Sequence, residues 1–109
     1  MGDDVLEKIE AGIQRVLADP VLRSELAGWK RTVALKVERS YYTIRVEDNS
    51  ISVLKGKTRR PEVEIRLDKP TFMDIVTGKV SFTAAYLRGL LAFKGDVMAS
   101  DITRLQKLL

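Results

Sequence analysis

The chain opens with a helical hydrophobic pattern. Over residues 4–18, apolar side chains recur at spacings of three and four, which predicts an amphipathic helix. These residues are Leu6, Ile9, Ile13, Val16 and Leu17. Asp19-Pro20 then predicts a short second helix, with the aspartate as its cap and the proline at its first position. Gly28 ends this helical region.

From Arg31 the hydrophobic period changes to two, which is typical of strands with one packed face. Four runs between residues 31 and 67 predict an antiparallel meander, joined by a turn at 47–49 and a basic hairpin loop at 55–61. Because a slip of one residue would expose every apolar side chain, strict alternation fixes the inner face. We expect this face to comprise Val33, Leu35, Val37, Tyr42, Ile44, Val46, Ile51, Val53, Val63, Ile65 and Leu67. The opposite face should be solvated.

Helical signals return after residue 67. Pro70 opens a helix that ends at Gly78, and Ser81 caps another that ends at Gly89. Residues 90–94 predict a fifth strand, and Asp96 is expected to cap a last helix. That helix carries Met98, Ile102, Leu105 and Leu109 on one face. The order predicts one α+β domain over residues 1–109, a two-layer sandwich with a five-stranded, mainly antiparallel sheet and helices over one face.

The composition removes most routes to catalysis. The 109 residues include no cysteine and no histidine, which excludes thiolate chemistry, zinc–sulfur sites and the commonest general base. No nucleophile elbow, P-loop or dinucleotide-binding pattern occurs, so we expect no catalytic residue, metal site or cofactor. No apolar run approaches the roughly 20 residues of a membrane span, and the N-terminus is acidic rather than signal-like. A cytoplasmic, non-enzymatic protein is predicted.

Positive charge is concentrated in the middle of the chain. The formal net charge is +4, and the loop at 55–61 contributes four basic residues. These residues, Lys55, Lys57, Arg59 and Arg60, are candidates for peripheral contact with an anionic membrane surface. The alternative is a solvated loop. No aromatic side chain is interleaved to stack bases, which disfavours a nucleic acid partner.

The second half of the chain resembles the sterol carrier protein family, the type-two sterol-transfer domain. The segments that carry the resemblance are 63–67, 72–76, Gly78-Lys79-Val80, 85–89 and 91–96. Segments 42–46 and 51–56 are similar to the family's second and third strands, so the resemblance covers residues 31–109. The resemblance implies a five-stranded sheet with helices over one face, and a sterol, fatty acyl chain or other lipid bound between them. Phe82 departs from the family pattern, because the family usually has proline or a small residue there, and a bulky side chain could fill part of the cavity.

The apolar residues of the later elements are the candidate ligand-binding residues. We expect a cleft under the third, fourth and last helices, lined by Phe72, Ile75, Val76, Phe82, Tyr86, Phe93, Met98, Ile102 and Leu105. An empty, dry cavity of ~300 Å³ would cost about 7 kcal/mol, comparable to the stability of a small domain. The cleft must therefore be filled by an apolar lipid-like molecule, open transiently, or be a solid core. In the last case the protein would be a structural module or homo-oligomer using its apolar helix layer as an interface.

Overall fold

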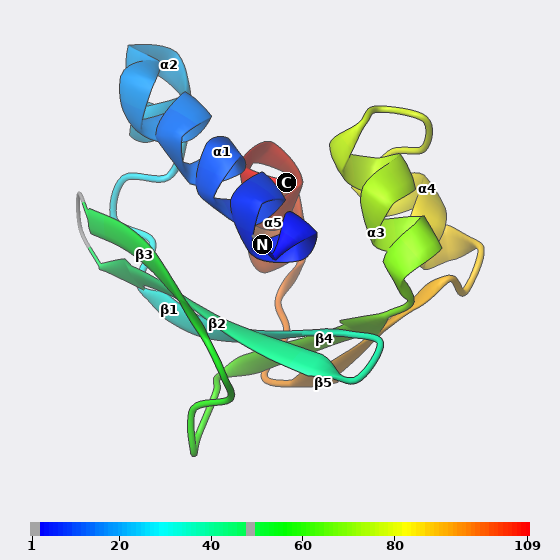
Figure 1. Cartoon of the computed structure of the whole chain (residues 1–109). Helices are drawn as coiled ribbons and strands as arrows, with labels where there is room; N and C mark the ends of the chain where they lie inside the picture. Colours follow the sequence, from blue (N-terminus) through cyan, green and yellow to red (C-terminus); the bar gives the residue numbers. More distant parts are fainter. Residues whose placement is uncertain (1–2, 48–49) are drawn as a thin grey trace.

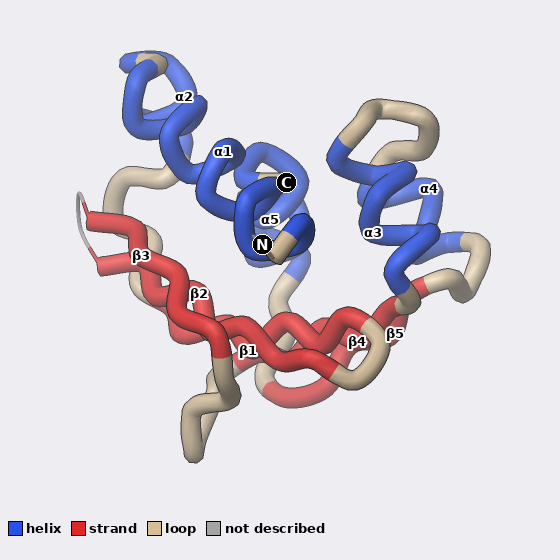
Figure 2. The backbone as a smooth tube through the Cα atoms, in the orientation of Figure 1, coloured by secondary structure: helices blue, strands red, loops and turns tan. Residues whose placement is uncertain are grey.

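The computed structural model describes residues 3–47 and 50–109, which form one sheet with helices over one of its faces (Figures 1 and 2). The elements follow in the order α1 (Asp4–Ala18), α2 (Pro20–Glu25), β1 (Arg31–Val37), β2 (Ser40–Glu47), β3 (Ser50–Lys55), β4 (Val63–Leu67), α3 (Lys69–Val76), α4 (Phe82–Leu87), β5 (Leu91–Gly95) and α5 (Ala99–Leu108). The predicted α+β sandwich is confirmed. None of the described helices is long and apolar enough to cross a membrane.

The strand order differs from the predicted meander. The sheet runs β3-β2-β1-β4-β5, and β4 pairs in parallel with β1, while the other neighbours are antiparallel. Residues 56–62 are therefore a crossover and not a hairpin loop. Crossing from β3 to β4 spans three strand spacings, about 14 Å, which a seven-residue connection of about 23 Å reach easily covers. The predicted turn at Asp48-Asn49 lies outside the described residues.

The crossover covers part of the sheet face that was expected to be solvated. The Thr43 hydroxyl donates to the Gly56 carbonyl (2.7 Å) and accepts from the Thr58 amide (3.1 Å). Beneath this connection, Ala34, Thr43 and Glu64 are buried although they point away from the helices. The prediction of a fully solvated outer face is therefore wrong at these positions, because the loop packs on them.

The inner face of the sheet is the predicted one. Its central residues are buried against the helices, and Ile51 and Val53 on the edge strand β3 are half-buried. The core they form also includes Val5, Ile9, Ile13 and Val16 of α1. Gly12 lets α1 cross α5 closely, since a Cβ there would meet the Leu108 carbonyl oxygen.

The second and fourth helices start at the predicted caps, Asp19 and Ser81, and the third has Asp68 as its cap. Asp19 accepts from the Val21 amide, Asp68 from the Thr71 amide and Ser81 from the Ala84 amide. The last helix is not capped by Asp96 as predicted. It begins at Ala99 with Met98 as N-cap, and the Asp101 carboxylate accepts from the Met98 amide (3.0 Å). Met98 therefore precedes the apolar face of α5 and does not belong to it.

Candidate functional site

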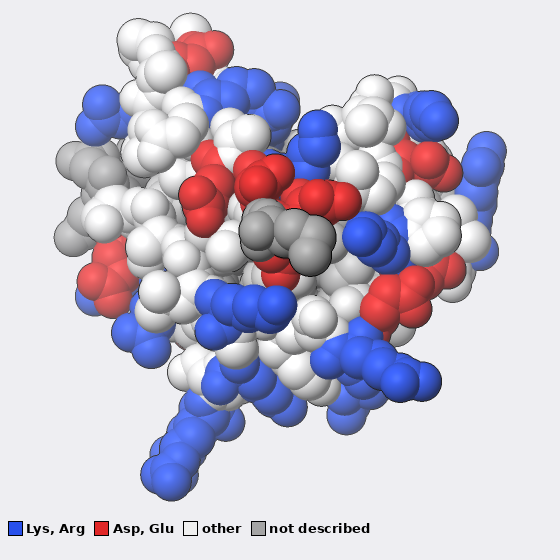
Figure 3. Space-filling view, in the orientation of Figure 1, with Lys and Arg blue, Asp and Glu red and all other residues white. Residues whose placement is uncertain are grey.

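The helix layer is divided by a groove. Helices α1, α2 and α5 lie over one part of the sheet and α3 and α4 over another (Figure 1). An open groove of about 370 Å³ lies between the two groups. It is lined by Arg15, Ile75, Val76, Gly78, Val80, Ser81, Phe82, Gln106 and Leu109. The space-filling view shows the surface indented between the α1–α2 side and the α3–α4 side (Figure 3).

The groove combines an apolar wall with a polar rim. Ile75 and Phe82 are buried, and Val76, Val80 and Leu109 are half-buried against the core. The exposed polar residues at its edge are Arg15, Ser81 and Gln106, and no described lining residue is acidic. Such a surface suits a molecule with an apolar body and a polar or anionic end.

Two exposed polar contacts of the described residues join the two helix groups. The Thr83 hydroxyl on α4 donates to Gln106 Oε1 on α5 (2.9 Å), and Lys69 Nζ at the start of α3 lies 3.8 Å from Asp4 Oδ2 on α1. Each is worth little in water, about 0–1 kcal/mol. The two helix groups are thus held in place mainly by apolar contacts, which join both groups and the sheet in one continuous core.

The predicted ligand-binding residues fall into separate groups. Ile75, Val76 and Phe82 line the groove. Phe72 and Leu105 are fully buried in the core below it, and Ile102 is half-buried there. The remaining three lie away from the groove lining: Tyr86 and Phe93 pack edge-on against each other, and Met98 is exposed, with its sulfur 3.2 Å from the Arg31 guanidinium. The set as a ligand site stays a prediction.

Sequence reasoning missed the polar rim and part of the apolar wall of the groove. Leu109 carried a signal, because it falls on the apolar stripe of the last helix. Arg15, Ser81 and Gln106 carried none, since isolated polar residues on helices or at their caps match no motif. Arg15 Nη2 donates to the Lys107 carbonyl oxygen (3.0 Å), so this rim position depends on α1 meeting the end of α5.

Away from the groove, a polar cluster fixes the start of α1. Asp3 caps the helix through the amides of Val5 and Leu6 and accepts a hydrogen bond from the Tyr42 hydroxyl. Lys55 Nζ lies 2.9 Å from Asp3 Oδ2. The hydrogen bond from Lys55, with that from Tyr42, holds the pKa of Asp3 well below its usual range. Burial, aided by the bond to Asp3, raises the pKa of Tyr42 to about 12.

A buried carboxylate, Asp101, lies at the start of α5. Asp101 accepts from the Trp29 indole N–H (2.8 Å), and Arg31 Nε lies 3.3 Å from it. These contacts satisfy Asp101 and explain its burial as structural. No group of three acidic side chains that could hold a metal ion occurs within residues 3–47 and 50–109.

The predicted anionic-surface residues are partly committed to other contacts. Lys55 pairs with Asp3, and Lys57 Nζ lies 3.4 Å from the buried Glu64 and over the Tyr41 ring. The hydrogen bond from Arg66, with that from Lys57, lowers the pKa of Glu64. Arg59 and Arg60 are exposed, and neither forms an ion pair with another described residue.

The fold and the sequence together define the class of protein. The model of the SCP-2 sterol transfer family matches residues 9–109. The chain belongs to this family, and the resemblance inferred from its second half is confirmed. Membership places it among domains of lipid binding and transfer. A search of curated proteins finds no match.

Solved structures share the fold at low sequence identity. The sterol carrier protein domain 2 of Helicoverpa armigera is 18% identical, with a TM-score of 0.74, over 94% of this chain and 85% of that one. The palmitated SCP2L2 of Aedes aegypti is 16% identical, with a TM-score of 0.57, over 91% of each chain. The sec-alkylsulfatase of Pseudomonas sp. is 18% identical, with a TM-score of 0.61, over 80% of this chain. This chain spans only 14% of that enzyme.

Proposed function

We propose that this chain binds or transfers a lipid-like molecule, such as a sterol or fatty acyl chain, in the groove between its two helix groups and without catalysing a reaction. The observation that carries the proposal is the groove itself, which has an apolar wall and a rim without acidic residues among those described. The part of the apolar tail nearest the core would lie on Ile75, Val76 and Phe82. The polar end would lie near Arg15 and Gln106, which offer hydrogen-bond donors.

The energetics favour an open groove that a ligand deepens. Water fills an open groove, so the groove avoids the cost of about 7 kcal/mol for a dry cavity of ~300 Å³. The apolar side chains beneath it, Phe72 and Leu105, are packed in the core. Acyl chains longer than the groove would require α3 and α4 to move away from α1 and α5. Among the described residues, the polar interactions that oppose this movement are the exposed contacts Thr83–Gln106 and Lys69–Asp4.

The proposal is tested by the thermal response of delipidated protein to palmitate, chosen because the Aedes aegypti protein is palmitated. A ligand that binds only the folded state adds RT ln(1 + [L]/Kd), or about 2.7 kcal/mol at a hundredfold excess over Kd. Val76→Trp should fill the groove and reduce this response. Val21→Trp is the matched control, because Val21 is 65% exposed on α2 and does not line the groove.

A melting temperature that fails to rise with palmitate, acyl-CoA or cholesterol would contradict the proposal. Equal responses from Val76→Trp and Val21→Trp would place binding outside the groove. In the first case the structural alternative would lead, with the helix layer as a protein–protein interface. Sedimentation of the same delipidated sample would then show self-association.

A further inference from the structure

A second surface lies at the far end of α4 from the groove. The α4 tip, which we define as Tyr86, Leu87, Arg88 and Leu90, forms the end of this helix and the turn into β5. Leu87 is 77% exposed, Leu90 45% and Tyr86 42%. Large aliphatic side chains grouped on a protruding turn are uncommon on a surface that meets only water, and such patches mark interaction sites.

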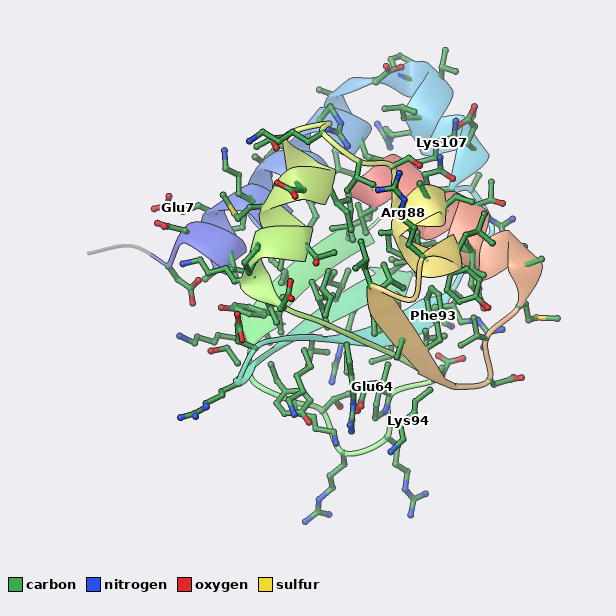
Figure 4. The ribbon with its side chains drawn as sticks, turned by 90° about the vertical axis from the view of Figure 1, so that its right-hand side faces the viewer. Glu7, Glu64, Arg88, Phe93, Lys94 and Lys107 are labelled. Atoms are coloured by element: carbon green, nitrogen blue, oxygen red, sulfur yellow. The ribbon has the colours of Figure 1, made fainter. Side chains whose placement is uncertain are left out.

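The α4 tip has an ordered aromatic base. The Tyr86 ring packs edge-on against Phe93 of β5, with centroids 5.0 Å apart, and Phe93 packs in the same way on the buried Phe82, at 5.9 Å. Gly89 adopts a φ of 73°, which ends α4 and turns the chain back toward the sheet. Figure 4 shows Arg88, directly after the last residue of α4, above Phe93 on β5, on the face of the molecule that carries these elements.

The charged residues near the α4 tip in the sequence are all basic. Residues 75–95 contain Lys79, Arg88 and Lys94 and no aspartate or glutamate. Arg88 forms no ion pair with any other described residue. Exposed leucines beside an unneutralised arginine and a half-exposed tyrosine are the combination that binds the interface of an anionic bilayer.

We propose that the α4 tip docks the protein on anionic lipid membranes, with Leu87 and Leu90 entering the boundary between head groups and acyl chains. A second copy is a poorer occupant, because a two-fold interface centred on the tip would bring Arg88 close to its own counterpart. A peptide ligand would need a groove, and the tip protrudes. The proposal does not rest on the bound ligand, although α4 joins the two surfaces: Phe82 at its start lines the groove and Leu87 at its end forms the tip.

Membrane binding through the α4 tip and membrane binding through the basic loop would respond differently to salt and to substitutions. Of the loop cations, Lys55 and Lys57 already pair with Asp3 and Glu64, and the one large exposed apolar side chain beside the loop, among the described residues, is Leu54 of β3. Binding through the loop would depend mainly on Arg59 and Arg60, would fall with salt, and would be lowered by Leu54→Ser. Binding through the tip adds an apolar contribution that salt does not screen.

The test is co-sedimentation with phosphatidylcholine vesicles that do or do not contain phosphatidylserine. Leu87→Ser should lower the partition coefficient on the anionic vesicles by about tenfold or more, from the loss of one buried leucine. Arg88→Gln should lower it by about fivefold, and less at high salt. Leu54→Ser is the matched control, because Leu54 is 67% exposed on β3, the opposite edge strand of the sheet, and should leave binding unchanged. Fluorescence of Trp29, the single tryptophan, which is buried, verifies that each variant is folded.

Several outcomes would overturn the proposal. Equal vesicle binding by Leu87→Ser and Leu54→Ser would show that the position of an exposed leucine does not matter for membrane binding. An Arg59→Gln, Arg60→Gln double variant that abolishes binding while Leu87→Ser retains it would assign docking to the loop. Loss of a dimer in sedimentation of Leu87→Ser, with vesicle binding intact, would assign the tip to self-association.

Discussion

The variant Phe82→Ala tests whether the groove accepts a ligand or whether its residues only form a solid core. Phe82 is fully buried, forms part of the groove lining, and packs edge-on against Phe93. Its replacement by alanine would extend the groove inward by the volume of the ring. Phe72→Ala is the matched control, because Phe72 is equally buried on the neighbouring helix but does not line the groove.

The magnitude follows from burial. Removing a buried phenylalanine costs about 3–5 kcal/mol, and the aromatic pair with Phe93 contributes about 0.5–1.5 kcal/mol beyond burial. Because the new space opens onto the groove and water can enter, we expect Phe82→Ala to lose about 3 kcal/mol. Phe72→Ala leaves a closed cavity and should lose at least as much. Each kcal/mol lowers the melting temperature of a domain this size by about 4–8 °C.

The assay is calorimetric unfolding of both variants with increasing palmitate. We expect Phe82→Ala to bind palmitate more tightly than the unsubstituted protein, so that at the same saturating palmitate concentration it gains more stability, by about 1.4 kcal/mol for each tenfold decrease in Kd. Phe72→Ala should gain no more from palmitate than the unsubstituted protein. Equal gains for the two variants, or no gain for Phe82→Ala, would refute the assignment of Phe82 to the ligand site.

Three further perturbations test other parts of the structure. The folded-state pKa of Tyr42, about 12, lies above the ordinary value of 10.0, so the neutral side chain stabilises the folded state below pH 10 and this stabilisation is lost as pH rises to 12. Urea unfolding should show a loss of up to about 2.7 kcal/mol in the free energy of unfolding over this range, and a smaller loss in Tyr42→Phe. Thr83→Val removes the hydrogen bond to Gln106; stopped-flow release of a fluorescent fatty acid should become faster, with about 1 kcal/mol or less lost in stability. Gly12→Ala should lose about 1–3 kcal/mol in the same urea assay, because its methyl group meets the backbone of α5, and an unaltered midpoint would contradict that crossing.

The alternation of apolar and polar residues predicted the strands and the packed face of the sheet, because successive side chains of a strand point to opposite faces whatever its neighbours are. It did not predict which strands are neighbours. The parallel pairing of β1 with β4 depends on the crossover at 56–62, and a loop of that length permits either a hairpin or a crossover. The burial of Glu64 follows from the same crossover, which covers this position and brings Lys57 to its carboxylate, while Arg66 pairs with Glu64 from the same strand.

The candidate site was predictable only in its apolar part. Ile75 and Phe82 fall on the apolar stripes of their helices, which any packing of those helices would turn inward. The rim positions Arg15 and Gln106 are exposed residues of helices distant in sequence, and they meet only because α1 and α5 pack side by side. Met98 was included because the last helix was expected to start earlier, at Asp96.

The most direct test of the central claim is an NMR measurement of intermolecular NOEs between bound palmitate and the methyl groups of the protein. We predict NOEs from the acyl chain to Ile75, Val76 and Leu109, which lie along the groove. The exposed Val21 of α2 should show none. Saturating palmitate that gives no NOE to the three groove residues, or gives them only to methyl groups outside the groove, would contradict the account.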